Sequence, residues 1–486
     1  MATTLSFLLY AVVVIAIGVW AARRSLDTAS DIHLAGRDHG TWTSALSASA
    51  STESGFLLLG MVGMGYGVGA NALWIVPAGI FGYALNWVVL APRLREKSEA
   101  LDALTVPEFI AASTGGGRTS RIAGFVAAVL GFAFLVAYVA AQFSAAGKAL
   151  STQFEFSYLT AVGLSAGLVA AYALLGGFRA VSWTDNLQAI MMALALLVLP
   201  VLVIVRAGGI GEVWTQLATL DATLVSFTAG ATGINGVALA VLPWLMLGLA
   251  YPGQPHAVAR LMAARDASVF RGAWAIATGW FVLTYTGAVA LGMSARAAFS
   301  DVGAIAADPE TTLPVLAEAF LPGVIAGVVL AAILAAITST ADSTLLSAAT
   351  TLVRDGRAAL GQSGRERFWM RVAIVAITAL AILFALDESP VVFTLVLYAW
   401  AGLGASLGPV VLYCALVRQP RAPAALAGLL VGGLLILLLR DHALNLLIGF
   451  AASAASIAVA HAVSPKMSES EKNDAAHNAS PSHEIA

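Results

Sequence analysis

The stretch Ala335-Ala336-Ile337-Thr338-Ser339-Thr340-Ala341-Asp342-Ser343-Thr344 places a carboxylate and five hydroxyl groups inside an apolar run that covers residues 320–353. Charged and polar side chains are costly in the hydrocarbon core of a membrane, so they usually line a cavity or bind a ligand. Asp342 and Ser343 follow Ser339 by three and four residues, which predicts one shared helix face. Oxygen atoms on one face suit a hard cation such as Na⁺. The structural alternative is that these hydroxyls bond to neighbouring helices or to carbonyls of their own helix.

The chain as a whole is very apolar. Of its 486 residues 59% are hydrophobic and only 11% are charged, and the mean hydropathy is +0.87. Soluble proteins carry about 25% charged residues. We therefore predict an all-α polytopic membrane protein in a lipid bilayer, because the apolar runs are too long for the alternating strands of a membrane barrel. The net charge of −2 gives no indication of a nucleic-acid partner, and the single Cys414 excludes a disulfide within the chain.

Hydropathy predicts about thirteen transmembrane helices in a transmembrane domain that covers residues 1–462. The predicted segments are residues 5–22, 42–66, 71–92, 120–148, 156–176, 182–206, 234–253, 270–295, 318–353, 368–386, 390–417, 422–439 and 442–462. No basic side chain precedes the first segment, which indicates a retained helix rather than a cleaved signal peptide. Residues 463–486 are polar and are predicted to form a disordered cytoplasmic tail.

The basic residues indicate how the protein is oriented in the membrane. Of the 25 Lys and Arg residues, all except Lys148, Arg206, Arg296 and Arg440 fall on one side, in loops or in the tail. Because basic loops stay in the cytoplasm, we expect an external N-terminus and a cytoplasmic C-terminus. The expected location is the plasma (inner) membrane.

Two of the predicted spans carry signals of interruption. Residues 47–55 combine small residues, competing hydroxyls and the carboxylate of Glu53, and residues 248–256 contain two prolines and two glycines. The two segments lie about five spans apart, which predicts a five-plus-five inverted repeat with core units of about 42–206 and 234–417. Broken helices of this kind form the binding sites of secondary transporters. The structural alternative is a pair of ordinary helix kinks.

Motifs along the chain resemble those of the sodium/solute symporter family, most closely its sodium/proline symporter branch. The matching segments are residues 31–37 (DIHLAGR), 50–57 (ASTESGFL), 103–109 (ALTVPEF), 176–188 (GGFRAVSWTDNLQ), 253–260 (GQPHAVAR) and 333–340 (ILAAITST). The resemblance extends from about Leu5 to Val417, and the last two spans match only in hydropathy. It implies a leucine-transporter-like fold with one additional leading helix and two trailing ones. It also implies a symporter, not an enzyme, that couples solute import to Na⁺.

The resemblance further implies which residues bind cations. The ligands of one Na⁺ would be the carbonyls of Ala50, Glu53 and Ala336 with the hydroxyls of Ser339 and Thr340. Some relatives hold a second Na⁺, and the corresponding residues here are Asp185, Ser339, Asp342 and Ser343. Asp342 replaces a usual hydroxyl, so this second site would either bind a cation more strongly or keep one acid protonated. Proton coupling therefore remains an open alternative.

By the same resemblance, the solute would lie between the two interrupted helices. The implied solute-binding residues are Thr52, Ser54, Gly55, Phe56, Tyr138, Leu247, Tyr251 and Pro255. Several positions depart from the proline branch: Thr52 stands in place of an aspartate, and both Phe56 and Leu247 replace a tryptophan. We expect proline or a related amino acid as the solute. The alternative is another small carboxylate or amine.

Two acidic residues allow more than one interpretation. Glu53 could ligate Na⁺, take up a proton, bind a cationic group of the solute, or face a water-filled vestibule. Asp185 could bind a cation or stabilise the start of its helix. Other classes of protein have little support: the seven histidines show no paired metal-ligand spacing, and no nucleotide-binding loop or channel filter motif is present.

Overall fold

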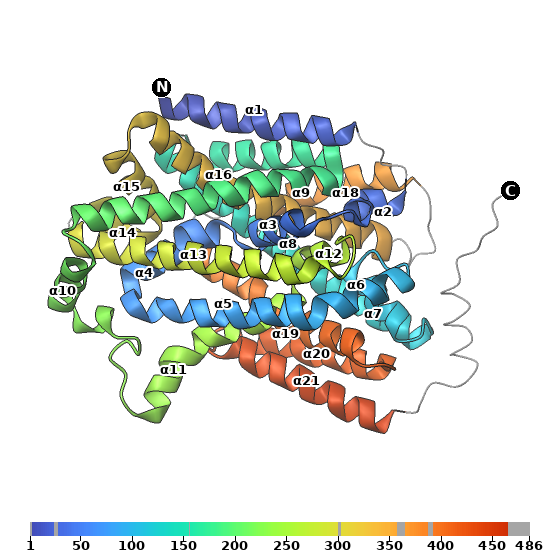
Figure 1. Ribbon diagram of the computed structural model, residues 1–486. Coiled ribbons are helices and arrows are strands. Elements are labelled where there is room, and N and C mark those ends of the chain that lie inside the picture. The colour runs from blue at the N-terminus through green and yellow to red at the C-terminus, as the bar shows by residue number, and fades with distance from the viewer. Residues whose placement is uncertain are drawn as a thin grey trace.

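The computed structural model describes residues 2–23, 28–154, 156–299, 303–356, 365–386 and 392–464. Within these ranges the regular structure is helical apart from one isolated bridge between His39 and Ala264. The longer helices run roughly parallel to one another (Figure 1). The all-α membrane architecture predicted from composition is confirmed. Most of the tail predicted to be disordered, from residue 465 onward, lies outside the described residues.

The first half of the chain contains α1 (Ala2–Ala22), α2 (Ala29–Leu34), α3 (Thr41–Thr52), α4 (Val62–Val68), α5 (Ile75–Ala84), α6 (Ala91–Ala100), α7 (Val106–Ser113), α8 (Arg118–Phe154) and α9 (Tyr158–Arg206). The second half contains α10 (Ile210–Leu220), α11 (Gly233–Leu245), α12 (Pro255–Met262), α13 (Val269–Ala298), α14 (Gly303–Ala307), α15 (Thr312–Phe320), α16 (Gly323–Thr350), α18 (Glu366–Phe384), α19 (Val392–Leu416), α20 (Ala422–Leu438) and α21 (Asn445–Val463). Short π or 3₁₀ segments η2 (Phe56–Met61) and η6 (Met246–Gly253) complete the two interrupted spans.

Within the described ranges, ten helices are long and apolar enough to cross a membrane. The thirteen segments predicted from hydropathy all fall on helices, and the difference in number has simple causes. Residues 8–21 and 422–438 form apolar helices that are shorter than 18 residues. The segments 42–66 and 71–92 meet in one continuous helical stretch, Phe56–Ala100. Conversely, the two spans inside α9 are separated at Gly177, whose φ of 55° favours glycine.

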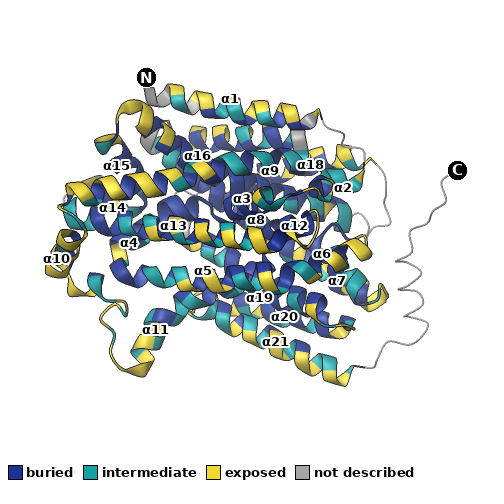
Figure 2. Cartoon of the chain, in the orientation of Figure 1, coloured by how far each residue is buried: buried dark blue, intermediate teal, exposed yellow. Residues whose placement is uncertain are grey.

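Burial distinguishes central from peripheral helices. In the most apolar 18-residue windows, 83% of the residues of α16 and 89% of those of α19 are buried, compared with 22% for α21. Figure 2 shows this buried centre, with exposed residues on the outer helices, where lipid would lie. Helix α16 packs against α9, α8 and α1, and α19 packs against η6, α8 and α20. The hydroxyl-rich stretch of α16 therefore lies in the interior and not on the lipid-facing surface.

Both predicted interruptions are present in the backbone. Helix α3 ends at Thr52, and Glu53 is extended with φ −99° and ψ 100°. In the second interruption η6 ends at Gly253, Gln254 is extended, and α12 begins at Pro255. Short helices close the two ends of the bundle: α10 and α14 lie at one end, and α2, α6 and α7 lie at the other (Figure 1).

Candidate functional site

The first interruption exposes a backbone carbonyl to α16. In an unbroken helix the Ala50 carbonyl would accept a hydrogen bond from the amide four residues later, but α3 ends before that turn is completed. The Ser339 hydroxyl donates instead to the carbonyls of Ala50 (2.8 Å) and Ala336 (2.9 Å). The Thr340 hydroxyl lies 3.5 Å from the Ala50 carbonyl. Two carbonyls and two hydroxyls thus converge in a completely buried place.

This group of oxygens fits a hard cation, because Na⁺, like other hard cations, is bound by carbonyl and hydroxyl oxygens. Four of the five implied ligands, Ala50, Ala336, Ser339 and Thr340, are brought together. No hydrogen bond within the described residues links the Glu53 carbonyl to them. We refer to these four residues as the oxygen cluster.

A second polar group surrounds Asp185, which is completely buried eight residues beyond the break at Gly177. Its Oδ2 accepts hydrogen bonds from Ser47 (2.6 Å) and Ser51 (3.3 Å) on α3 and from Arg260 (2.9 Å) on α12. The carboxylate therefore joins three helices and does not serve as a helix-start charge.

The guanidinium of Arg260 lies beside two of the four residues for which the family resemblance implies a second Na⁺, Asp185 and Ser343. It is completely buried and donates to Asp185, to the Ser343 hydroxyl (2.5 Å), to the Ser47 hydroxyl (3.0 Å) and to the His256 carbonyl (2.7 Å). It also lies 5.2 Å from the centroid of the Phe178 ring. Two of the four predicted ligands are thus already paired with a cation that belongs to the protein. Sequence reasoning missed this role of Arg260.

Asp342 is the second acid of this region, and it too is completely buried. It accepts hydrogen bonds from the Tyr172 hydroxyl (2.5 Å) and from the hydroxyl of Ser343 (2.9 Å). Asp185, Asp342 and Arg260 together contain two acids and one base. If both acids are ionised the group carries one uncompensated negative charge, which is costly in a buried place.

Glu53, at the first interruption, points to a group of tyrosines. Its Oε1 accepts hydrogen bonds from Tyr83 and Tyr251, each at 3.3 Å, and its Oε2 accepts a short one from Tyr285. The side chain is buried, and no ion pair links it to a basic residue of the described chain. Tyr83 and Tyr285 were not predicted as site residues.

A small cavity lies beside this tyrosine group, between the two interruptions. Its volume is about 20 Å³, enough for a single water molecule. It is lined by the predicted solute residues Thr52, Phe56, Tyr138, Leu247 and Tyr251, and also by Ile75, Gly79, Gly248, Tyr285, Val396, Leu397 and Trp400. We call it the central cavity.

The other three predicted solute residues lie elsewhere. Ser54 and Gly55 form the backbone of the interruption: the Ser54 hydroxyl accepts from the Phe56 amide (3.0 Å), and the Gly55 amide donates to Gln142 (3.2 Å). Pro255 lines a different cavity, near the cytoplasmic side predicted from the basic loops.

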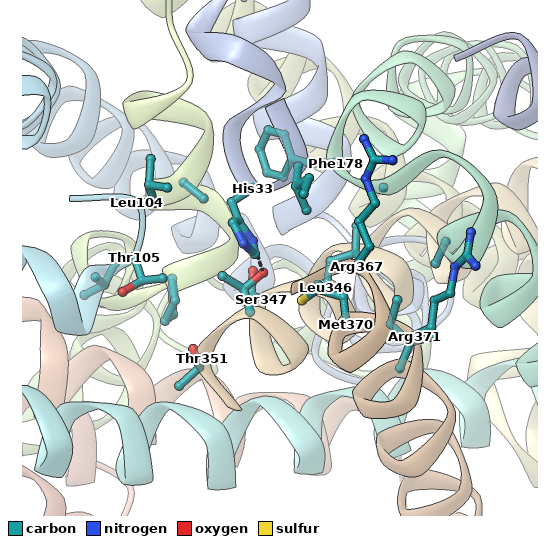
Figure 3. A pocket seen from close by; sticks show the side chains of 18 of the residues that line it. His33, Leu104, Thr105, Phe178, Leu346, Ser347, Thr351, Arg367, Met370 and Arg371 are labelled. Carbon is teal, nitrogen blue, oxygen red and sulfur yellow. Dashed lines mark hydrogen bonds between the residues drawn. The ribbon is translucent and has the colours of Figure 1, made fainter. Parts of the chain in front are cut away.

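That inner cavity has a volume of about 100 Å³ and lies between α7, α9, α12, α16 and α18. Figure 3 shows His33 and Ser347 near its middle, with Arg367 and Arg371 along one wall. The His33 Nδ1 bonds to the Thr350 hydroxyl at 3.1 Å. The inner cavity shares no lining residue with the central cavity.

Basic side chains tie the inner loops together. Arg37 donates to the carbonyls of Ala103 and Met262, each at 2.9 Å, and Lys97 donates to those of Cys414 (3.1 Å) and Val417 (2.9 Å). Burial lowers the pKa of Arg37 to about 10, which still leaves it charged at neutral pH. These bonds hold the inner ends of α3, α6, α12 and α19 close.

The opposite side is more open. An outer cavity of about 850 Å³ is lined by residues of α8, α11, η6, α19 and α21, among them Ala137, Met246 and Asn445. Leu247 and Leu397 line both this cavity and the central cavity. The central cavity therefore borders the outer cavity, whereas it has no lining residue in common with the inner cavity.

The chain is similar to known proteins over most of its length. The model of the Sodium:solute symporter family matches residues 32–432. The high-affinity proline transporter PutP of Bacillus subtilis strain 168 is 34% identical over 91% of this chain and 94% of its own length. The sodium/proline symporter of Escherichia coli K12 is 33% identical, over 90% of this chain and 87% of its own length.

Solved structures share the fold at low sequence identity. A Na⁺-coupled sialic acid symporter, in a substrate-bound outward-open state, superposes with a TM-score of 0.81 at 18% identity and covers 96% of this chain and 99% of its own. The nucleobase-cation-symport-1 family transporter Mhp1 superposes with a TM-score of 0.58 at 15% identity and covers 93% of this chain and 100% of its own. The leucine-transporter-like fold expected from the sequence is confirmed.

Proposed function

This chain belongs to the sodium:solute symporter family, and we propose that it imports proline, or a related small amino acid, together with Na⁺. One observation carries the proposal. The interruption after Thr52 places the oxygen cluster, through Ala50, and the central cavity, through Thr52 and Phe56, within one short stretch of chain. An ion bound at the oxygen cluster can therefore change the shape of the central cavity, and a solute bound in the cavity can change the ion site.

The coupling would work through the end of α3. Na⁺ bound by Ala50 and Ala336 carbonyls with Ser339 and Thr340 hydroxyls would hold α3 against α16. Thr52 follows Ala50 by two residues, so the same contact fixes the wall of the central cavity. A pre-shaped wall binds solute more tightly, because less conformational freedom is lost on binding.

Alternating access would then require two barriers to open in turn, one between the central cavity and the outer cavity and one on the inner side. The central cavity must expand before it can hold an amino acid, and Leu247 and Leu397 are the side chains that separate it from the outer cavity. Release to the cytoplasm requires the inner bonds of Arg37 and Lys97 to break. We propose an external N-terminus and a cytoplasmic C-terminus in the plasma membrane, as the basic loops indicate.

The group of Asp185, Asp342 and Arg260 supports a second, coupled cation. Its two acids and one base leave a buried negative charge, and uptake of Na⁺ or H⁺ at Asp342 would remove it. A symporter for another small carboxylate or amine, coupled to H⁺, is therefore the alternative function.

The test is uptake of labelled proline into proteoliposomes, with an inward Na⁺ gradient and with a matched H⁺ gradient. Accumulation driven by Na⁺ supports the proposal, and accumulation driven by H⁺ alone supports the alternative. No accumulation under either gradient would show that the altered residues Thr52, Phe56 and Leu247 have changed the solute.

A further inference from the structure

We propose that Glu53 orients the hydroxyls of Tyr251 and Tyr285 so that one end of the central cavity offers only hydrogen-bond acceptors, and that the cavity thereby selects a solute with a protonated amine. The inference rests on the proposed role of this cavity as the solute site. It adds a specificity-determining group that the sequence could not assign.

The first step is the direction of the hydroxyl protons. A tyrosine hydroxyl has one proton, and an ionised carboxylate can only accept hydrogen bonds. Tyr251 and Tyr285 both use that proton on Glu53. Both residues also line the central cavity. What remains available on each phenolic oxygen is therefore a lone pair, which accepts hydrogen bonds and does not donate them.

The second step is charge. Glu53 is 1% exposed, and Tyr83, Tyr251, Tyr285 and Thr52 are its hydrogen-bond partners. All four are neutral, so whenever Glu53 is ionised its negative charge has no ion-pair partner among the basic side chains of the described residues. A buried charge acts strongly across a low-dielectric interior. The field at the neighbouring cavity thus favours a cation.

The third step is the aromatic surroundings. The Tyr251 and Trp400 rings pack edge to face, with their centroids 5.0 Å apart. The centroids of the Tyr285 and Phe56 rings are 6.5 Å apart. All four rings line the central cavity. Aromatic faces attract ammonium groups, and most strongly where water is excluded. The acceptor oxygens, the negative electrostatic field and the aromatic ring faces therefore all favour the same kind of ligand, an organic ammonium ion.

Tyr138 supplies the opposite polarity. It is completely buried and lines the same cavity, and its hydroxyl, near Ser54, has no well-formed hydrogen bond within the described residues. A buried hydroxyl of this kind is costly unless a ligand satisfies it. Its free proton can be donated to a carboxylate of the solute. The cavity thus has an acceptor end and a donor end, which match the two charges of a small amino acid.

A purely structural role for Glu53 is the competing explanation, since the same contacts join α3, α5, η6 and α13. The two explanations differ in Glu53→Gln. A glutamine keeps the size of the side chain, but its amide nitrogen donates. The hydroxyl of one tyrosine must then accept a hydrogen bond from this amide nitrogen. Its own proton, no longer used on residue 53, would point toward the cavity. The acceptor end would become a donor, and the preference for amines would fall.

The experiment measures competition against the uptake of labelled proline into proteoliposomes with an inward Na⁺ gradient. Two probes with the same five-membered ring are compared: pyrrolidine, which has the amine, and tetrahydrofuran, in which an ether oxygen replaces the nitrogen. In the unmodified protein we expect the amine to compete and the ether not to. Glu53→Gln should reduce the ratio of the two inhibition constants roughly tenfold or more. The matched control is Glu310→Gln, which removes a buried carboxylate that pairs with Lys148 and does not line the central cavity, and it should leave the ratio unchanged.

Two further measurements keep the inference separate from folding and from the proposed function. Tyr285→Phe and Tyr251→Phe remove one acceptor each without touching the carboxylate, and each should lower amine competition more than Na⁺ affinity. If proline is not transported at all, the same amine and ether probes are compared by thermal stabilisation. Amines that stabilise the unmodified protein but not Glu53→Gln still support the inference. Equal stabilisation by both probes, or an unchanged preference in Glu53→Gln, overturns it.

Discussion

Arg260 on α12 and Asp185 on α9 form an ion pair of 2.9 Å in which both side chains are completely buried. The two residues are 75 positions apart in the chain, and the hydroxyls of Ser47 and Ser343 complete their surroundings. The pair joins both interrupted helices to α9 and α16. A cation built into the protein thus pairs with Asp185, one of the residues for which the family resemblance implies a second Na⁺.

Removal of Arg260 should therefore be costly. Arg260→Ala leaves the Asp185 charge buried and unpaired, and we expect a loss of about 3–5 kcal/mol in the free energy of unfolding. Thermal unfolding in detergent measures it. The exposed Arg271→Ala is the control, with an expected change within about 0.5 kcal/mol. Na⁺ should stabilise Arg260→Ala more than it stabilises the unmodified protein, because the vacated place can accept it. A loss no larger than that of Arg271→Ala would contradict this account.

The sequence predicted the spans and both interruptions, because these depend on local properties. Apolar length sets the spans, and the prolines at 252 and 255 with the glycines at 248 and 253 cannot maintain a regular helix. The contact between the Ala50 carbonyl and the Ser339 hydroxyl was implied by the family resemblance alone. It depends on the packing of α3 on α16, across 289 positions, which periodicity does not encode.

Other site residues could not be predicted from the sequence for a physical reason. Arg260 sits on a short helix next to an inner loop, and its partners Ser47, Asp185 and Ser343 come from three other helices that no sequence pattern brings together. Tyr83 and Tyr285 lie in apolar spans, where aromatic residues usually pack against neighbouring helices and have no other role. Only the three-dimensional fold shows that both reach Glu53.

The oxygen cluster leads to a prediction about ion dependence. Ser339→Ala or Thr340→Ala removes one hydroxyl ligand, so the Na⁺ concentration needed for half-maximal uptake should rise roughly tenfold or more. The affinity for the solute at saturating Na⁺ should change far less. Thr344→Ala is the control on the same helix, because within the described part of the chain its hydroxyl bonds only to the carbonyls of Thr340 and Ala341. Equal effects on ion and solute would count against the assigned ion site.

Asp342 permits a separate test of the second cation. Asp342→Asn keeps the size of the side chain and removes its charge, so the group with Asp185 and Arg260 becomes neutral without an added ion. We expect the charge moved per solute to fall by one, measured from the membrane potential at which net uptake stops. Tyr172→Phe removes a hydrogen bond to the same carboxyl and leaves its charge, so it should leave the charge per solute unchanged. An unaltered ratio in Asp342→Asn would remove this residue from the coupling scheme.

Lys97 offers a way to follow opening on the inner side. Its ammonium group donates to the carbonyls of Cys414 and Val417, at the inner end of α19, and Cys414 is the single cysteine of the chain and completely buried. Lys97→Met removes these bonds but keeps most of the apolar stem, so the inner side should open more often. Cys414 should then react faster with a membrane-permeant maleimide, and Na⁺ should slow that reaction by holding α3 against α16. Lys148→Met, which alters the opposite end of the bundle, should leave the rate unchanged. Identical labelling rates for Lys97→Met and the unmodified protein would show that these bonds do not keep the inner side closed.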